Sequence, residues 1–230
     1  MSLFAIGDTH LSFGVEKPMD VFNGWNNYEK RLETNWRNIV TDDDTVLICG
    51  DVSWGMKLEE ALPDFKFLES LPGKKLLMKG NHDYWWETVS KMNRLFEANS
   101  ITSIGFLFNN AVRVGDICVV GTKGWFYDSG AEDEEKALNR ELCRLKLSLR
   151  EAQKLGGEPV AFLHYPPISN RAVCEEIVDL LSEYGVRRCF YAHLHGPSIK
   201  NAFIGDYKNI RFSLISGDSL GFCPHLVEKF

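Results

Sequence analysis

Five short apolar runs, each followed directly by Asp, Asn or His, constrain the fold of this chain more than any other feature. The runs cover residues 3–7, 46–50, 76–80, 160–163 and 189–192. Runs of this length with mainly apolar residues are typical of strands buried on both faces. We therefore expect a buried sheet system in which polar side chains collect where the strands end.

Amphipathic helical patterns lie between these runs. Apolar residues recur at helical spacing around 32–40, 89–96, 132–155 and 177–184, with Gly156-Gly157 and Gly185 as stop signals. Residues 58–71 share this period, but Pro63 must kink that helix or begin a second one. Alternating patterns around Gly115-Asp116 and Lys208-Asn209 indicate hairpins. Strand–helix alternation followed by hairpins predicts an α/β fold with mixed sheets and helices outside.

Length and charge narrow the class of protein. A chain of 230 residues fits one α/β domain, so we expect a single domain over residues 1–230. It has no apolar run of about 18 residues and no signal-peptide pattern, which predicts a cytoplasmic protein without membrane contact. The net charge of −6 and the lack of a Lys/Arg cluster disfavour nucleic acid as a partner. The oligomeric state stays open.

The polar residues that follow the runs carry the chemistry. Five of the six histidines are among them. The positions are Asp8, His10, Asp51, Asn81, His82, His164, His193 and His195. Asp8 and His10 are two residues apart, so on an extended backbone their side chains would leave on the same side, and the same holds for His193 and His195. In α/β folds, ligands bind beyond the carboxyl ends of the strands, so we expect one shared site.

These donor types predict a pair of transition-metal ions. Carboxylate, imidazole and amide oxygen suit manganese foremost, with iron, zinc or nickel as alternatives, and the lack of thiolates argues against structural zinc. Seven ligands exceed the needs of one ion, and a carboxylate such as Asp51 can bridge two. Two dications with two carboxylates and a hydroxide retain positive charge, so an anionic substrate is expected. Phosphoester hydrolysis by a hydroxide that bridges the metals is the natural reaction.

Five ordered motifs support this interpretation. They are Asp8-Thr9-His10, Gly50-Asp51, Gly80-Asn81-His82-Asp83, His164 and His193-Leu194-His195. Together they resemble the motifs of the calcineurin-like metallophosphoesterase superfamily. The resemblance implies a four-layer α/β/β/α sandwich with two facing mixed β-sheets. It also implies one metal held by Asp8, His10, Asp51 and His195, and a second held by Asp51, Asn81, His164 and His193.

The same resemblance implies catalytic roles for His82 and Asp83. His82 corresponds to the histidine that contacts the phosphoryl group and protonates the leaving oxygen, and Asp83 would orient it. Capping of the following helix is an alternative for Asp83. The chain departs from the family at Val52-Ser53, where phosphoprotein phosphatases have Asp-Arg, so the arginine clamp for a monoester is missing. Ala192 also replaces the usual glycine before His193.

The expected protein is thus an enzyme, a metal-dependent phosphoesterase acting on a phosphodiester or a small phosphomonoester. The alternatives are an inactive metallophosphoesterase-like scaffold that binds a partner protein and a serine/threonine protein phosphatase. Residues 11–27 leave directly from His10 and are the candidate flap for selecting substrate. Lys123 and Arg171 are candidate phosphate contacts, and aromatic residues such as Trp54 and Tyr127 are candidates for the mouth of the site.

Overall fold

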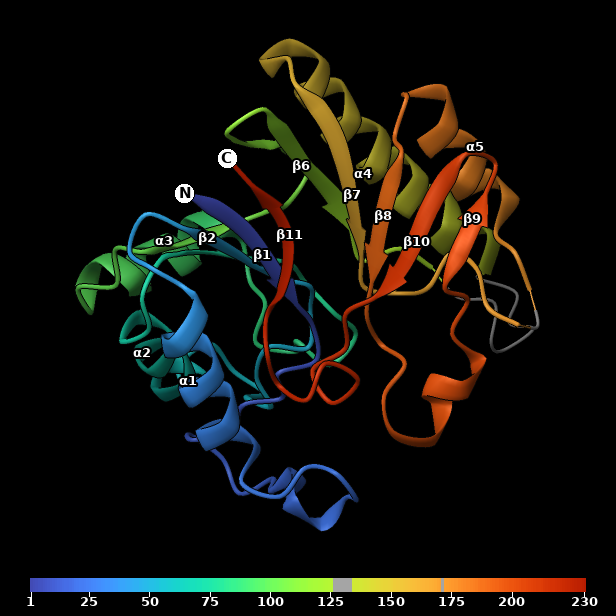
Figure 1. Cartoon of the computed structure of the whole chain (residues 1–230). Helices are drawn as coiled ribbons and strands as arrows, with labels where there is room; N and C mark the ends of the chain where they lie inside the picture. The colour runs from blue at the N-terminus through green and yellow to red at the C-terminus, as the bar shows by residue number, and fades with distance from the viewer. Residues whose placement is uncertain (126–133, 171) are drawn as a thin grey trace.

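The computed structural model describes residues 1–125, 134–170 and 172–230, which form two mixed sheets with helices on their outer faces (Figure 1). The first sheet has the order β11-β1-β2-β3-β4 and the second the order β5-β6-β7-β8-β10-β9. The first consists of β1 (Ser2–Ile6), β2 (Thr45–Ile48), β3 (Lys74–Leu77), β4 (Ile104–Phe106) and β11 (His225–Lys229). The second consists of β5 (Val112–Val114), β6 (Ile117–Thr122), β7 (Glu158–Leu163), β8 (Arg188–Tyr191), β9 (Gly205–Tyr207) and β10 (Ile210–Leu214).

Three hydrophobic cores separate four layers. Side chains such as Trp36 and Phe65 pack between the first sheet and its helices. Leu47 and Phe162 belong to the core between the two sheets, and Leu145 packs under the helices of the second sheet. The helices are α1 (Tyr28–Ile39), α2 (Leu62–Glu69) and α3 (Val89–Ala98) on the first sheet, and α4 (Glu134–Leu155) and α5 (Glu175–Glu183) on the second. The predicted α/β/β/α sandwich with two mixed sheets is confirmed.

Local signals account for most element boundaries. Pro63 lies in the first turn of α2, so it begins a helix rather than kinking one. The Lys208-Asn209 turn between β9 and β10 has positive φ at both residues (47° and 61°), as a type I′ hairpin requires. The first described residue of α4 is Glu134, so the expected start at residue 132 lies outside the described residues.

Two strands were not predicted from the apolar pattern of the sequence. β4 has three residues and includes Gly105, and β11 has the sequence HLVEK with largely exposed side chains. Both are edge strands of the first sheet, where one-sided burial leaves little apolar signal. β11 pairs with β1 from the far end of the chain, through contacts such as Ser2 with Lys229. The formation of a short edge strand therefore depends more on pairing with its neighbour than on its own amino-acid sequence.

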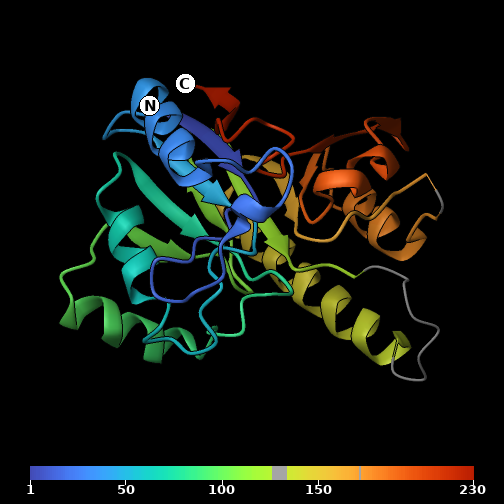
Figure 2. The ribbon, with the colours of Figure 1, turned by 90° about the horizontal axis from the view of Figure 1, so that it is seen from below.

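The strand directions bring the functional loops to one place. β1, β2, β3 and β4 run parallel, and so do β6, β7, β8 and β10. Their carboxyl ends point downward in Figure 1, and Figure 2 looks onto the loops that follow them. None of the described helices combines the length and the apolar character that a membrane span needs.

Candidate metal centre

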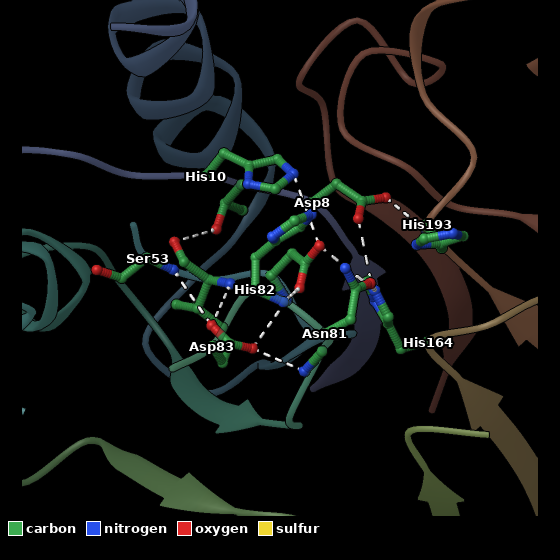
Figure 3. Close-up of polar contacts among 12 residues, drawn as sticks. Asp8, His10, Ser53, Asn81, His82, Asp83, His164 and His193 are labelled. Atoms are coloured by element: carbon green, nitrogen blue, oxygen red, sulfur yellow. Dashed lines mark hydrogen bonds and ion pairs between the residues drawn. The ribbon is translucent and has the colours of Figure 1, made fainter. Parts of the chain in front are cut away.

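The seven predicted metal ligands converge at the shared carboxyl edge of the two sheets, and Figure 3 labels five of them, Asp8, His10, Asn81, His164 and His193. Their strands differ: β1 precedes Asp8 and His10, β2 precedes Asp51, β3 precedes Asn81, β7 precedes His164, and β8 precedes His193 and His195. Residues that are distant in the chain thus meet because parallel strands end at the same edge.

Two groups of side chains have ligand atoms within 4.8 Å of one another. One group is Asp8, His10 and Asp51, and the other is Asp51, His164 and His193. Asp51 belongs to both, which is the arrangement expected for a bridging carboxylate. The other two predicted ligands flank these groups. Asn81 Oδ1 is 2.7 Å from His164 Nε2, and the His195 ring lies 5.3 Å from the His10 ring.

The ligands stand on turns and not on extended strands. β1 ends at Ile6, and Asp8 and His10 have φ of 52° and 43°. Asp51 and His193 are also left-handed, with φ of 51° and 71°. The expectation that alternation along an extended backbone aims Asp8 and His10 together is therefore wrong. Such conformations cost roughly 1–2 kcal/mol per non-glycine residue, and they persist only where the surroundings enforce them.

Hydrogen bonds between the ligand loops supply that enforcement. The backbone N–H groups of Asp8 and His10 donate to the carbonyls of Gly50 (3.1 Å) and Asp51 (2.9 Å). The carboxylates are held as well, since Asp51 Oδ1 accepts from the His82 N–H and Asp8 Oδ2 accepts from the His193 N–H, both at 2.8 Å. Each loop is thus fixed by its neighbour, and the ligands are held in place together.

Glycine is needed where these loops touch. A Cβ on Gly80 would lie 2.1 Å from Asp51 Oδ1, so any side chain there would displace the shared carboxylate. Gly7 faces Ala192, and a Cβ on Gly7 would come within 2.4 Å of the Ala192 Cβ. The methyl group that replaces the family's usual glycine at position 192 is therefore accommodated by the glycine at position 7.

Burial sets the charge states of these groups. Burial lowers the pKa of His10 to about 3, and burial together with His164 lowers the pKa of His193 to about 3, so both imidazoles are neutral. Burial opposes ionisation of Asp51, but His164 and His10 outweigh it and hold its pKa well below the usual range. Burial alone would lower the pKa of His164, whereas Asp51 and Asp8 raise it to about 9.

The donor set fits metal cations. His164 Nδ1 donates to the Cys49 carbonyl at 3.0 Å, and Nε2 lies 2.7 Å from Asn81 Oδ1, so a metal ion there would replace the proton that the raised pKa keeps on Nε2. Asp8 Oδ1, Asp51 Oδ2 and both His10 nitrogens are buried without a hydrogen-bond partner among the described residues. Acceptors that face one another in a buried site need a positive charge between them. The residues present therefore fit a pair of metal ions.

His82 and Trp54 form the wall beside the ligands. The His82 ring is half-buried, 5.9 Å from the His10 ring and 4.8 Å from the Trp54 ring. Trp54 also stacks on His10 at 4.7 Å with an interplanar angle of 21°. It follows Val52-Ser53, where protein phosphatases have the Asp-Arg pair, so an aromatic ring lines this side of the site. Trp54 was expected only as one of several aromatic residues near the mouth.

Asp83 differs from its expected role. Its carboxylate accepts from the backbone N–H groups of Gly80 (2.7 Å), Asp51 (2.9 Å) and Val52 (2.8 Å), and from the Trp85 indole (2.9 Å). Both oxygens are thus used on loop backbone, and the prediction that Asp83 orients the His82 ring is corrected. The alternative of helix capping fails too, because Thr88 caps α3. Asp83 instead ties the loop after β2 to the loop after β3.

Residues 11–27 reach the metal centre through Trp25, and their backbone crosses in front of the strand ends in Figure 2. Trp25 is buried, with its ring 5.8 Å from the His10 ring and 6.0 Å from the His195 ring. The Lys17 ammonium sits 4.9 Å from the centre of the Trp54 ring. A cavity of about 960 Å³ runs between this segment and residues 195–199. The flap role stays a prediction, and Tyr127 and Arg171 lie outside the described residues.

The loop after β10 was missed by the sequence reasoning. Ser216 pairs with Gly7, and Asp218 accepts a hydrogen bond from the Gly196 N–H at 2.6 Å. Asp218 lines the cavity beside His195. The signal was present, because the apolar run before Ser216 ends in Gly217-Asp218, in the same way as the other strand ends.

Comparison with known proteins agrees with this site. The sequence profile of the calcineurin-like phosphoesterase family matches residues 1–197. No curated protein matches the chain. The fold is similar to that of the protein of unknown function AQ665 from Aquifex aeolicus, with 13% identity, a TM-score of 0.54, and coverage of 98% of this chain and 95% of that one.

A second similar structure is TT1561 of Thermus thermophilus, with 12% identity and a TM-score of 0.55. That likeness covers 84% of this chain and 81% of that one. At such identities the two structures support the fold alone. The family match extends over all five motifs, from Asp8 to His195. The chain therefore belongs to the calcineurin-like phosphoesterase family.

Proposed function

We propose that this protein is a dimetal-dependent phosphohydrolase that cleaves a phosphodiester or a small phosphomonoester. The observation that carries the proposal is the sharing of Asp51 between two adjacent buried ligand groups. One carboxylate placed between two sets of nitrogen and oxygen donors is the requirement for a pair of close metal ions. Family membership supports the same reaction class.

Manganese is the proposed metal, with iron, zinc and nickel as the alternatives that the same donors accept. Asp8, His10, Asp51 and His195 would hold one ion, and Asp51, Asn81, His164 and His193 the other. Such a pair, when bound, supplies a nucleophilic oxygen near neutral pH and offsets the charge of the phosphoryl group. The protein's own contribution is to hold these donors rigidly and to position the substrate.

His82 is the proposed contact for the leaving group. Its backbone N–H donates to the shared carboxylate, so the residue is fixed beside the ligands, and its ring is half-buried on the Trp54 side. From there an imidazole can donate a hydrogen bond to the phosphoryl group and a proton to the departing oxygen. Trp54 offers a flat apolar surface in place of an arginine clamp, which favours diesters and small esters over the phosphoserine of a protein.

The test is hydrolysis by purified protein reconstituted with Mn²⁺. Bis-p-nitrophenyl phosphate and p-nitrophenyl phosphate report diesterase and monoesterase activity, and elemental analysis reports bound metal. We expect turnover of at least one substrate with two metal ions per chain. Two bound ions with no turnover of either substrate, nor of a panel of small phosphate esters, would contradict the proposal and favour a scaffold role.

A further inference from the structure

A second pocket lies at the same carboxyl edge, beside the metal centre. Its volume is about 120 Å³, which is room for several water molecules. Lys79 follows β3, Thr122 and Lys123 lie at the end of β6, and Arg144 reaches in from α4. The metal ligands follow β1, β2, β3, β7 and β8, so the pocket lies beside them along both sheets, toward β4 and β6.

The charge of this pocket is opposite to that of the metal ligands. Lys79, Lys123 and Arg144 line it. Glu141 is the nearby carboxylate, and it is already used, because Arg144 Nη1 and Thr122 Oγ1 donate to it at 2.5 Å each. Within residues 1–125, 134–170 and 172–230, neither lysine has a salt-bridge partner. Three cations and one carboxylate leave two positive charges, which match a phosphate dianion.

The positive charges of this pocket are partly buried and close to one another, which strengthens their attraction for an anion. Burial lowers the pKa of Lys123, and the nearby Lys79, Arg144 and Arg140 lower it further against the opposing effect of Glu141. Cations that crowd together in a partly buried pocket gain from an anion between them. The cluster is therefore different from lysines spread over a solvated surface.

A buried aromatic residue forms one wall of this pocket. Trp86 lines the pocket and is only 9% exposed, and its indole Nε1 has no hydrogen-bond partner among the described residues. A buried N–H costs free energy when it is left unpaired. The indole nitrogen is itself buried, so Trp86 contributes a wall of the pocket while the cations contribute its charge.

One aromatic ring separates this pocket from the metal ligands. The Lys123 ammonium is 5.7 Å from the centre of the Tyr165 ring, and that ring is 4.5 Å from the His193 ring. Lys79 stands directly before Gly80-Asn81 in the ligand loop. A substrate with its reacting phosphate at the metal centre could therefore place a second anionic group in the pocket.

We propose that this basic pocket, formed by Lys79, Lys123, Arg144 and Trp86, is an oxyanion subsite that holds a second phosphate group of the substrate. The inference rests on the proposed function and makes it more specific. It assigns the enzyme to substrates that carry two phosphate groups, only one of which is attacked. The subsite takes no part in bond cleavage, so its contribution is to binding.

The first test is calorimetric titration of the manganese-loaded protein with inorganic phosphate. The variant is Lys79→Gln with Lys123→Gln, which leaves no carboxylate unpaired, and the matched control is Lys66→Gln with Lys74→Gln, two exposed lysines. We expect two phosphates per chain for the wild type and the control, and one for the variant. Equal stoichiometry and affinity in wild type and variant would overturn the proposal.

The outcomes separate the two proposals. If the wild type binds a single phosphate and the variant loses it, the pocket is supported and the metal centre fails as a phosphate site. If the wild type binds a single phosphate and the variant keeps it, the pocket fails. Should the double variant not fold, Arg144→Lys retains the charge beside Glu141 but loses the planar fork, and a phosphate affinity several-fold weaker is expected.

The second test is kinetic. Sugar bisphosphates and nucleoside bisphosphates are compared with the corresponding monophosphates, and the quantity followed is the ratio of kcat/KM between each pair. We expect the variant to lower this ratio by about tenfold or more, mainly through KM, because charge-assisted hydrogen bonds to the second phosphate are lost. An equal loss for both substrate types, or a wild type that does not prefer bisphosphates, would refute the subsite.

Discussion

Buried polar side chains are hydrogen-bonded at the amino ends of the strands, whereas several at the carboxyl ends are not. At the amino end, Lys75 is 1% exposed, and its ammonium donates to the Leu71 and Gly73 carbonyls at 2.8 Å each. Glu69 similarly accepts hydrogen bonds from Thr102 and Ser103. At the carboxyl end, by contrast, acceptors such as Asp51 Oδ2 and donors such as Trp86 Nε1 have no hydrogen-bond partner among the described residues.

This contrast holds throughout the part of the chain that the structure describes. Every buried side-chain nitrogen or oxygen that lacks a hydrogen-bond partner there belongs to a loop after the carboxyl end of a strand. Unpaired groups and left-handed ligands reduce stability, whereas paired groups at the opposite edge do not. One edge of the sandwich is thus prepared for ligands, and the other maintains the fold. Substitutions at the two edges are expected to change different properties.

The largest effect is expected for Asp51→Asn. Loss of the shared carboxylate should lower kcat/KM by about 1,000-fold, because both metal ions depend on it. Elemental analysis should find at most one ion per chain. The free energy of unfolding of the chelator-treated protein should decrease at neutral pH, because His164 and His10 stabilise the ionised Asp51 carboxylate in the folded state. Asp116→Asn, at a 99% exposed side chain, is the control. If Asp51→Asn kept two metal ions and its kcat/KM fell less than tenfold, the carboxyl edge would not depend on this shared carboxylate.

The next effect is expected for His82→Gln. We expect a decrease of about 100-fold in kcat for an alkyl phosphate ester, whose leaving oxygen needs a proton, and a smaller decrease for p-nitrophenyl phosphate. Bound metal should not change. His225→Gln, on the exposed β11 strand, provides the control. If both leaving groups lose the same factor, His82 has no role in protonation.

Asp83 is an exception among the residues of the carboxyl edge, because both of its carboxylate oxygens accept hydrogen bonds. It should therefore affect stability in the way that residues of the amino edge do. Asp83→Asn retains one acceptor oxygen and should lower the free energy of unfolding by about 2–3 kcal/mol, because loop N–H groups lose their partner. Urea denaturation measures this change. A loss of activity at unchanged stability would restore the acid–base role that the sequence suggested.

At the amino edge, Glu69→Ala should affect stability and not catalysis. Its carboxylate binds the backbone of Thr102 and Ser103 and so attaches the start of β4 to α2. We expect a loss of about 2 kcal/mol in the free energy of unfolding with unchanged kcat/KM. Glu87→Ala, which removes an exposed pair with Lys91, should cost less than about 0.5 kcal/mol. A fall in kcat/KM for Glu69→Ala would show that the structure of the amino edge influences catalysis at the carboxyl edge.

The smallest effect concerns pH. Burial lowers the pKa of Lys75 to about 8, against about 10.4 in an unfolded chain. Between these values the unfolded chain binds more protons, so this residue's contribution to stability rises with pH and is lost as pH falls. We expect the wild type to gain about 1 kcal/mol between pH 8 and pH 9 relative to Lys75→Met. Lys74→Met, at an exposed neighbour, should keep the wild-type slope. Equal slopes in wild type and Lys75→Met would contradict the assignment.

Much of the site could be predicted because its signals are local. The apolar run before Asp51 and the glycine at position 50 mark a strand end, and the side chains that follow identify the chemistry through their donor atoms. The same reasoning failed for Asp83, because two of its partners, the backbone N–H groups of Asp51 and Val52, are more than 30 residues away. It also did not group Lys79 with Lys123 and Arg144, since none of these residues has a distinctive neighbour in the chain.

The amino-acid sequence by itself determined the alternation of strands and helices, the helix boundaries at Pro63 and Gly185, and the types of residue available to bind metal. Only the tertiary structure decided how those residues are aimed. The left-handed turn at Asp8 depends on a hydrogen bond to Gly50, and the place of β11 depends on β1. Short-range propensity follows from neighbouring residues, whereas ligand geometry follows from contacts between strands that are distant in the chain.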